Sequence, residues 1–495
     1  MAKRDHTAEW TPLLEQLEKK KAWARELGGP ERVERFMHSR GKLDARQRIE
    51  RLFDPGSFVE LGVLVGAVEG IPGDAFVCGL GRVHGRPCMA GVEDFSTLAG
   101  SIGQGGTAQR YRIAELAMQE RVPLVMMLEG AGHRLTDTGG GGRAPNDLLA
   151  MADLGGHVPM VCLVLGASAG HGALAAPLSD FVIMSEQGAM FTGGPPLVKS
   201  ATGEEVTKEE LGGPQVCADI AGSVHNVAAN DEAAIDMARD YLSYFPLSRE
   251  GSPPRREGPD TGPRRVDELL AIIPPNDRQP YKMRKVIEHI VDDGSFFEIQ
   301  PRYGKSIIVG LAFIGGRAVG IVANDPWVRA GAMDSAASIK AMDFLENVGN
   351  FHHPVIFLAD NPGVMAGTKA EREGILKWGG KMFRAERRIT APKIHVTMRK
   401  AFGFGMVTMS GTPFDNQTLS FALPGVNLAS MPAVSGGKAA KLSEEEQRAA
   451  EEAQLAGPYR MANGMGVDDV IDPRELRNAL LAGLVLAEGR EEPQA

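Results

Sequence analysis

Short apolar runs that end at glycine alternate with longer amphipathic stretches along most of the chain. The run Val161–Gly166 leads into AGHGAL at 169–174, and the run Lys393–Met398 leads into FGFGMV at 402–407. Apolar runs of this length are typical of buried strands, and glycine lets the backbone turn sharply or approach a ligand closely. Each Gly-x-Gly pair therefore predicts a buried strand that ends in a tight turn.

Two further segments predict pairs of strands joined by a Gly-Arg turn. They are VCGLGRVHGRPCMAGV at 77–92 and IIVGLAFIGGRAVGIV at 307–322. A helical stretch and another apolar strand follow each pair, and then comes the Gly-x-Gly turn with its helix. This order predicts an α/β fold built from ββα units.

The second half of the chain repeats the first. Residues 45–61 match residues 283–299 at a shift of 238, and Gly170 matches Gly403 at a shift of 233. Drift of a few residues is what loop insertions produce, so we infer two copies of one domain. The pairs at a shift of 231 are Gly79 with Gly310, Gly100 with Gly331, Pro123 with Pro354, and Glu129 with Asp360.

A segment rich in proline, glycine and charge separates the two copies. It reads PLSREGSPPRREGPDTGPRR at 246–265, and such a composition cannot build a core, which indicates a linker. We expect an N-terminal domain over residues 1–250 and a C-terminal domain over residues 266–495. A chain of 495 residues exceeds what one core usually serves.

Composition narrows the classes of function. Four cysteines form no CxxC pair and lie mostly in apolar runs, which predicts buried, reduced thiols and no zinc ribbon. The N-terminus has no apolar signal region, and no apolar run is long enough to span a bilayer, so we expect a cytoplasmic protein without a membrane anchor. A net charge of -9 does not favour nucleic-acid binding.

The glycine turns are the best candidates for chemistry. A strand that stops at Gly-x-Gly presents backbone N–H groups, which can hold the oxygen of a carbonyl as it gains negative charge, worth roughly 3 to 4 kcal/mol per donor. Each turn lies near a second glycine turn, EGAGHR at 129–134 and DNPGVM at 360–365. Two holes suit a reaction in which two carbonyl compounds are polarised; the alternative is that the glycines only permit tight packing.

The residue between the two glycines differs between the copies. It is His171 in the first and Phe404 in the second, and phenylalanine cannot transfer protons. The equivalent phenylalanine therefore argues against proton transfer by His171, and packing or substrate contact is the favoured interpretation. No GxSxG elbow surrounds Ser168, and His352–His353 has no other ligands at metal spacing, so neither a hydrolase nor a metal site is predicted.

Three long motifs resemble one known family. They are GKLDARQRIERLFDPGSFVELG at 41–62, FTGGPPLVKSATGEEVTKEELGG at 191–213 and KSIIVGLAFIGGRAVGIVANDP at 305–326. They are similar to the carboxyltransferase β subunits of biotin-dependent acyl-CoA carboxylases, of the propionyl-CoA and 3-methylcrotonyl-CoA type. The resemblance implies two tandem crotonase-like domains in a homo-oligomer, commonly a hexamer, with acyl-CoA bound by the N-terminal domain and carboxybiotin by the C-terminal domain of a neighbour. It implies no metal and no covalent nucleophile, with biotin itself taking the α-proton.

Carried over by motif, the resemblance assigns the two holes. The thioester hole falls at the amides of Gly170 and His171, and the hole for the biotin ureido group falls at Phe404 and Gly405. Val407 stands where many members carry Asp or Ile, and with Phe404 it favours an acyl group bulkier than acetyl. The alternative is that Phe404 and His171 fill the pocket themselves and exclude long chains. The remaining residues expected to bind substrate are Gly130, Ala131, Gly132, Gly172, Gly363, Gly403 and Val407.

Other functions remain open at this point. The chain has no Met-Lys-Met biotinylation site and no ATP-binding module, so a separate biotin carboxylase and biotin carboxyl carrier subunit would supply carboxybiotin. One alternative is a decarboxylase subunit that runs the transfer in reverse. Another is a biotin-independent hydratase or isomerase of the crotonase fold, although AGHGALAAP offers none of the glutamates those enzymes need. A third is a scaffold subunit without activity.

Overall fold

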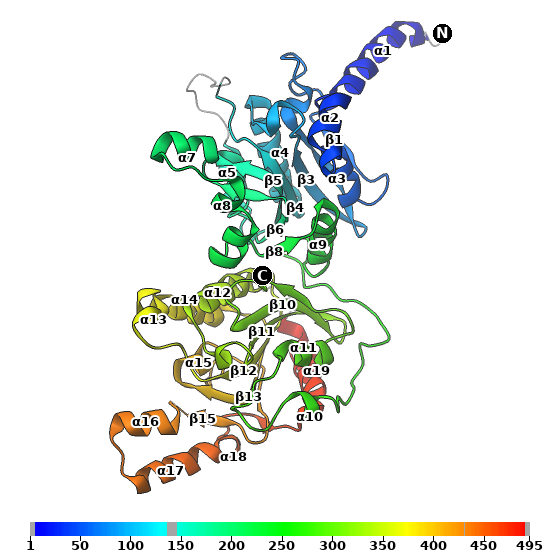
Figure 1. Ribbon diagram of the computed structural model, residues 1–495. Coiled ribbons are helices and arrows are strands. Elements are labelled where there is room, and N and C mark those ends of the chain that lie inside the picture. Colours follow the sequence, from blue (N-terminus) through cyan, green and yellow to red (C-terminus); the bar gives the residue numbers. More distant parts are fainter. Residues whose placement is uncertain (1–4, 136–145, 430, 491–495) are drawn as a thin grey trace. The chain divides into compact units, whose positions relative to one another are not determined.

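The computed structural model describes residues 5–135, 146–429 and 431–490. The chain divides into two compact units, Met1–Ser243 and Tyr244–Ala495, and each contains its own sheet (Figure 1).

The first unit is built on a mixed sheet in the order β1-β2-β3-β4-β5-β6-β8, with β7 paired to β5. The pairs β1–β2 and β2–β3 are antiparallel, and the later pairs are parallel. Its strands are β1 Val59–Leu61, β2 Phe76–Val83, β3 Arg86–Glu93, β4 Leu124–Gly130, β5 Met160–Ala169, β6 Phe181–Ser185, β7 Ala189–Phe191 and β8 Asn226–Ala228. Its helices are α1 Thr7–Ala24, α2 Pro30–Phe36, α3 Ala45–Leu52, α4 Gln104–Glu120, α5 Asp147–Asp153, α6 Gly170–Ala173, α7 Pro195–Thr202, α8 Lys208–Gly212 and α9 Asp231–Ser243.

The second unit repeats this plan in the order β9-β10-β11-β12-β13-β14-β16, with β15 paired to β13. Its strands are β9 Phe297–Ile299, β10 Ile307–Ile314, β11 Arg317–Asn324, β12 Val355–Asn361, β13 Lys393–Phe402, β14 Leu419–Ala422, β15 Asn427–Ala429 and β16 Asp469–Val470. Its helices are α10 Leu269–Ile272, α11 Met283–Ile290, α12 Ser335–Asn350, α13 Thr368–Arg372, α14 Ile375–Arg388, α15 Gly403–Val407, α16 Ala433–Ala440, α17 Glu444–Leu455, α18 Gly457–Asn463 and α19 Leu476–Leu486. The predicted repeat is confirmed, since the strand order and directions of the two sheets coincide.

The Gly-Arg turns form the predicted hairpins. In the turn between β2 and β3, His84 has φ of 51° and Gly85 has φ of 75°; between β10 and β11, Gly315 has φ of 62° and Gly316 has φ of 74°. Two consecutive residues with positive φ make the type I′ turn, whose twist matches that of the flanking strands. The glycines at these positions therefore set the register of both hairpins.

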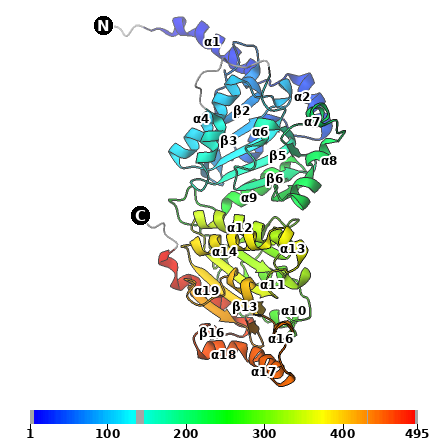
Figure 2. The ribbon, with the colours of Figure 1, turned by 90° about the vertical axis from the view of Figure 1, so that its left-hand side faces the viewer.

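Alternation along the strands places different side chains on the two faces of the first sheet. Cys162 and Val182 belong to a core cluster that also holds Ile113 of α4 and Met151 of α5. The neighbouring Phe181 stacks instead on Tyr241 of α9, with ring centroids 4.3 Å apart. Because successive side chains of a strand point to opposite faces, α4 and α5 cover one face and α9 covers the other. Figure 2 shows α12 and α14 side by side in the second unit, where they pack against each other.

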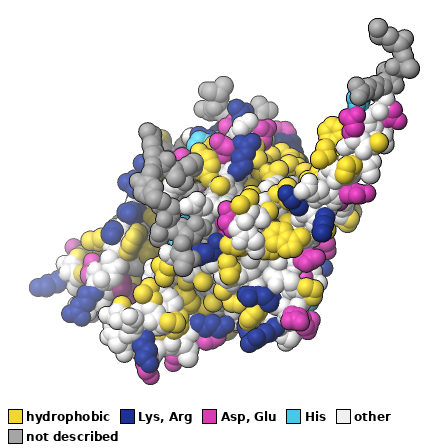
Figure 3. Space-filling model, turned by 90° about the horizontal axis from the view of Figure 1, so that it is seen from above, with side chains coloured by type: hydrophobic (Ala, Val, Ile, Leu, Met, Phe, Trp, Pro, Cys, Tyr) yellow, Lys and Arg dark blue, Asp and Glu magenta, His cyan; other side chains and the backbone are white. Residues whose placement is uncertain are grey.

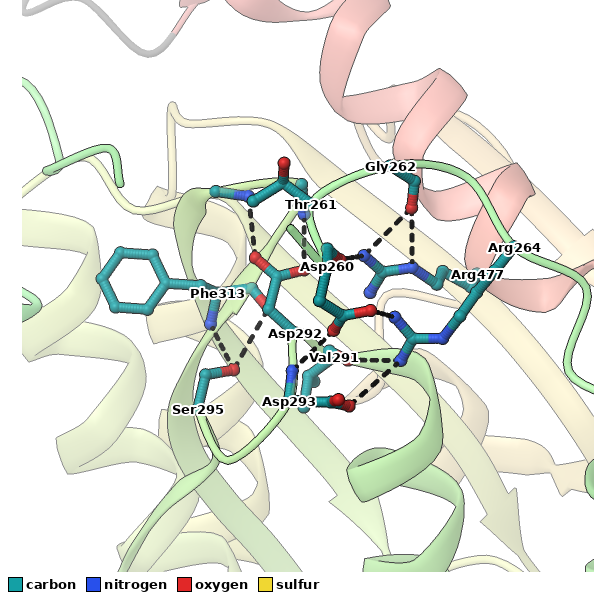
Figure 4. A network of polar contacts seen from close by, with 12 residues as sticks. Asp260, Thr261, Gly262, Arg264, Val291, Asp292, Asp293, Ser295, Phe313 and Arg477 are labelled. Carbon is teal, nitrogen blue, oxygen red and sulfur yellow. Dashed lines mark hydrogen bonds and ion pairs between the residues drawn. The ribbon is translucent and has the colours of Figure 1, made fainter. Parts of the chain in front are cut away.

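The segment predicted as a linker, 246–265, contains no helix or strand and lies against the second unit. Arg264 donates to the carbonyls of His289 and Val291 at 2.9 and 2.8 Å. The buried Arg477 of α19 donates to the Asp260 carbonyl and to Asp292, both at 2.7 Å (Figure 4). Arginine presents several N–H donors in a fixed fork, so a segment without regular structure is still tied to the domain that follows it.

Figure 3 shows α1 as an arm that extends from the rest of the first unit; Trp10, Leu13 and Leu14 are exposed on it. Within the described residues, no helix is long and apolar enough to cross a membrane. All four cysteines are free and buried, as predicted.

Candidate functional site

The first Gly-x-Gly turn lies where the adjacent parallel strands β4 and β5 end. Gly170 follows β5 with φ of 57°, and Gly132 follows β4 with φ of 81°. A Cβ atom added at Gly132 would lie 2.8 Å from the Ala169 carbonyl oxygen, so the two turns touch through their backbones. The structure thus brings together the predicted residues Gly130, Ala131, Gly132, Gly170, His171 and Gly172.

The second turn has the same backbone at the ends of β12 and β13. Gly403 has φ of 51°, and Gly363 has φ of 113°. A Cβ atom at Gly405 would lie 2.7 Å from the Cα atom of Gly363. The register slips at the same place in both sheets, before Gly130 and before Asn361. The predicted residues Gly363, Gly403, Phe404 and Gly405 therefore lie together. Val407 is the last residue of the short helix α15.

A network of hydrogen-bonded charged side chains lies beneath the first turn. His171 Nε2 lies 2.7 Å from Asp147 Oδ1, and Arg110 Nε donates to Asp147 Oδ2 at 2.7 Å. A second nitrogen of Arg110 donates to Glu93 Oε1 at 3.1 Å, while Glu93 Oε2 accepts the Glu129 amide at 2.8 Å. The side chains of Arg110 and Asp147 are 0% exposed and that of His171 is 17% exposed, so only the imidazole reaches the surface.

The surroundings of Asp147 keep it ionised. Burial works against the charge, but the hydrogen bond from His171 and the Arg110 guanidinium outweigh burial and lower the pKa of Asp147 to about 2. An ionised carboxylate only accepts hydrogen bonds, so His171 donates from Nε2. Burial raises the pKa of Glu93, although Arg110 opposes it, and burial together with nearby His171 lowers the pKa of His133. The His133 and His171 rings meet edge to face, 4.2 Å apart.

Sequence reasoning missed three members of this cluster, Glu93, Arg110 and Asp147. The search for a glutamate along AGHGALAAP found none, yet a Cβ atom at Gly172 would lie 2.7 Å from Glu93 Oε1. AGHGALAAP itself contains no glutamate, as stated above, but β3 supplies one to this turn from another part of the chain. Nothing in the spacing of these residues along the sequence indicates the cluster.

The neutral side-chain amides of two asparagines lie beneath the second turn. Asn324 Oδ1 accepts the Asp360 amide at 3.1 Å and the Asn361 side-chain amide at 2.9 Å. Asn361 Oδ1 in turn accepts the Gly363 amide at 3.0 Å. The Phe404 ring lies 6.2 Å from that of Phe383 and makes an edge contact with it. This turn is held by uncharged hydrogen bonds and flanked by aromatic surface.

The equivalent acidic residues Glu129 and Asp360 both accept hydrogen bonds from buried side chains. Glu129 pairs with Lys42 and with Arg48, and Asp360 accepts from Arg399 at 2.7 Å and from Tyr281 at 3.0 Å. Lys42 and Arg48 satisfy Glu129, whereas both donors to Asp360 meet its Oδ2, and its buried Oδ1 has no hydrogen-bond partner among the described residues. We assign both side chains to the framework beneath the turns. Among the described residues, no group of three or more His, Cys, Asp or Glu side chains could hold a metal ion.

Residues 37–494 match the carboxyl transferase domain family, and the chain belongs to that family. The human mitochondrial propionyl-CoA carboxylase beta chain is 34% identical, over 98% of this chain and 92% of the relative. The methylmalonyl-CoA decarboxylase subunit alpha of Veillonella parvula is 33% identical, over 97% of each chain. The crystal structure of transcarboxylase 12S, a hexamer assembly with methylmalonyl-coenzyme A bound, superposes with a TM-score of 0.91 at 32% identity, over 98% of this chain and 97% of that one.

These findings confirm the resemblance to the family and the predicted α/β fold of two tandem domains. The chain is a carboxyltransferase of the biotin-dependent carboxylase type.

Proposed function

We propose that the protein is the carboxyltransferase subunit of an acyl-CoA carboxylase. It moves a carboxyl group from carboxybiotin, held on a separate carrier subunit, to the α-carbon or vinylogous carbon of an acyl-CoA. The observation that carries this proposal is the doubled turn: Gly170 and Gly403 have φ of 57° and 51° after equivalent strands of two sheets with one topology. A transfer between two carbonyl compounds uses two such sites, one for each.

The first turn takes the acyl-CoA thioester, with its oxygen held by the amides of Gly170 and His171. Gly130, Ala131, Gly132 and Gly172 surround this site. Cβ atoms at Gly130 and Gly172 would lie 2.8 and 2.7 Å from the Glu93 carboxylate, so these two glycines leave room for it directly beneath the turn. Oxyanion donors stabilise the negative oxygen of the enolate more than the neutral thioester, which is the condition for accelerating the reaction.

The second turn takes the ureido group of biotin, with its oxygen held by the amides of Phe404 and Gly405. The residues present fit this group, because neutral Asn324 and Asn361 back the turn and a ureido group is itself neutral and planar. Biotin supplies the carboxyl group when bound. The chain's own part is to hold the ureido oxygen and, through Phe404, to exclude water from the transfer.

Val407 and Phe404 favour an acyl group larger than acetyl. Both are apolar, and the ring of Phe383 extends the apolar surface beside Phe404. Each added methylene that is buried contributes roughly 0.8 kcal/mol. The selectivity should stay modest, because apolar pockets separate chains that differ by one methylene by only about 10- to 200-fold.

The partners follow from the same proposal. A biotin carboxylase and a biotin carboxyl carrier subunit supply the donor, and the enzyme works in the cytoplasm as a homo-oligomer. The hexamer assembly named for transcarboxylase 12S supports an oligomer, in which the first turn of one subunit would serve with the second turn of another. Sedimentation of the active enzyme tests this: an active monomer contradicts it.

Transfer of labelled carboxyl from the carboxylated carrier to acetyl-, propionyl-, 3-methylcrotonyl- and longer acyl-CoAs tests the activity. Two variants of one residue sharpen the test. Phe404→Pro removes both the aromatic ring and the backbone N–H, whereas Phe404→Ala removes only the ring. We expect Phe404→Pro to fall roughly 10²- to 10³-fold below Phe404→Ala in kcat, as loss of one oxyanion donor does elsewhere.

Thermal melting of both variants checks that the fold survives. No transfer to any acyl-CoA by the wild-type enzyme would refute the proposal, and equal kcat values of the two folded variants would remove Phe404 from the hole. The relative from Veillonella parvula, a decarboxylase subunit, favours a second candidate, the reverse transfer. Methylmalonyl-CoA and uncarboxylated carrier in the same assay measure that direction.

A further inference from the structure

The ring of Phe404 lies against Gly379 of helix α14. A Cβ atom added at Gly379 would lie 3.0 Å from the Cε1 atom of this ring, 3.7 Å from Cδ1 and 4.0 Å from Cζ, and these are the three atoms nearest to it. Carbon atoms in contact prefer a separation of roughly 3.5 to 4.0 Å. A methyl group at Gly379 would therefore press on the Phe404 ring and displace it.

The next residue of the helix, Gly380, has different surroundings. Gly379 is buried, whereas Gly380 is exposed, and a Cβ atom at Gly380 would meet no atom within 4 Å. Glycine is a poor helix former at either position. The contact with Phe404 gives Gly379 a reason to lack a side chain that Gly380 does not share.

The first unit has a matching contact. Asp147 belongs to α5 and Gly379 to α14, and each of these helices precedes the strand that ends in the Gly-x-Gly turn. Asp147 contacts His171 by a hydrogen bond, and Gly379 contacts Phe404 by close packing. His171 and Phe404 are the residues between the two glycines of their turns. In both units, the helix before the strand therefore fixes the side chain between the glycines.

The position of the Phe404 ring affects the proposed biotin site, because the ring extends from the residue whose amide holds the ureido oxygen. The Phe404 carbonyl accepts the Thr408 amide at 3.0 Å, so the backbone of this residue is fixed within α15. A ring that is pressed from the side of α14 moves away from that helix while its backbone stays in place. Such a movement changes the space beside the amide donor.

We propose that Gly379 is a positioning residue for the biotin site. Its lack of a side chain lets the Phe404 ring lie against α14 and keeps the space beside the Phe404 amide open for the ureido group. This role rests on the proposed function, because it takes the second turn as the site of that group. A single methyl group on α14 should therefore hinder the binding of biotin on its carrier.

Gly379→Ala tests this role, and Gly380→Ala is its matched control. Both replace a glycine of one helix by a better helix former, so the contact with Phe404 is what distinguishes them. We expect the KM for the carboxylated carrier to be roughly 10-fold higher in Gly379→Ala than in Gly380→Ala, as displacement of one packed side chain implies. The kcat at saturating carrier should change less than the KM, because the amide donor remains. Equal KM values for the carrier overturn the proposal.

The same substitutions in a Phe404→Ala background show whether the effect passes through the ring. Without the ring, Gly379→Ala should leave the KM for the carrier as it is in Phe404→Ala alone. A further rise of the KM in this background would mean that Gly379 acts by another route and would overturn the positioning role.

Melting temperatures give a readout that does not depend on activity. Gly380→Ala should raise the melting temperature, because alanine favours the helix. Gly379→Ala should raise it less, or lower it, since the added methyl group presses on the Phe404 ring. In the Phe404→Ala background, Gly379→Ala should raise it as Gly380→Ala does. The same rise for both variants in the wild-type background would show that the ring is not in contact with Gly379, and the proposal would fail.

The two hypotheses fail separately. Transfer by the wild-type enzyme, with equal KM values for the carrier in Gly379→Ala and Gly380→Ala, overturns the role of Gly379 and leaves the proposed function standing. No transfer by the wild-type enzyme to any acyl-CoA overturns the proposed function, while the melting temperatures still decide whether Gly379 positions the Phe404 ring.

Discussion

The turns after β5 and β13 have the same backbone conformation but differ in the side chains that lie beneath them. Behind the first is a buried chain of charges from Glu93 through Arg110 and Asp147 to His171; behind the second, the amides of Asn324 and Asn361 bind each other. Glu93 and Asn324 are equivalent in the repeat. Each accepts the backbone amide of the acidic residue near the end of the next strand, Glu129 in β4 or Asp360 in β12. Duplication preserved the donors, while substitutions of the backing residues changed the electrostatic environment.

The difference shows which parts of such a site are free to change. A backbone amide survives any substitution except proline, so the hole persists whatever side chain stands there. The side chains beneath the turn decide whether its surroundings are charged, as in the first unit, or neutral, as in the second. The same backbone turn can thus lie above a charged network in one unit and above neutral amides in the other.

The largest expected effect comes from breaking the network of charged side chains beneath the first turn. Arg110→Met leaves two buried carboxylates without their common partner, and it should lower the free energy of unfolding of the first unit by about 3 to 5 kcal/mol. Asn324→Ala removes the neutral hydrogen bonds beneath the second turn and should cost about 1 to 3 kcal/mol. Urea denaturation of both variants measures the difference. Equal losses would mean that the charges behind the first turn are not effectively buried.

A smaller effect should follow pH. The folded-state pKa of Asp147 is about 2, below its ordinary value of 3.8, so its ionisation stabilises the fold at pH values above 4. This contribution, on the order of 2 kcal/mol, is lost as the pH falls from about 4 to about 2. Denaturation curves across that range, compared between the wild-type chain and Asp147→Asn, measure it. Parallel pH dependence in the two proteins would show that Asp147 is not the source.

The smallest effect separates the two hairpin turns. Alanine at either glycine must adopt positive φ, which costs roughly 1 kcal/mol. A Cβ atom at Gly85 would meet no atom within 4 Å, whereas one at Gly316 would lie 2.2 Å from the Arg256 carbonyl oxygen. Gly316→Ala should therefore lower the melting temperature more than Gly85→Ala. Equal shifts would indicate that residues 246–265 do not hold Arg256 against the second unit.

Much of the fold could be predicted from local patterns. The apolar runs, the Gly-Arg hairpins and the Gly-x-Gly turns all appear where the sequence predicts them, because alternation of side chains and positive φ are properties of neighbouring residues. The contacts of the segment 246–265 were not predicted. Its composition rules out a core, but not attachment through Arg264 and the buried Arg477, which come together only after α19 has packed.

The sequence by itself determined the doubled domain, the family and the positions of the two glycine turns, because each of these is written in short stretches of neighbouring residues. Only the tertiary structure decided what stands behind each turn. Glu93, Arg110, Asp147 and His171 come from β3, α4, α5 and α6, and no spacing along the chain relates them. Parallel strands bring their carboxyl ends to one edge of the sheet, and burial then makes each charge depend on its neighbours for a partner.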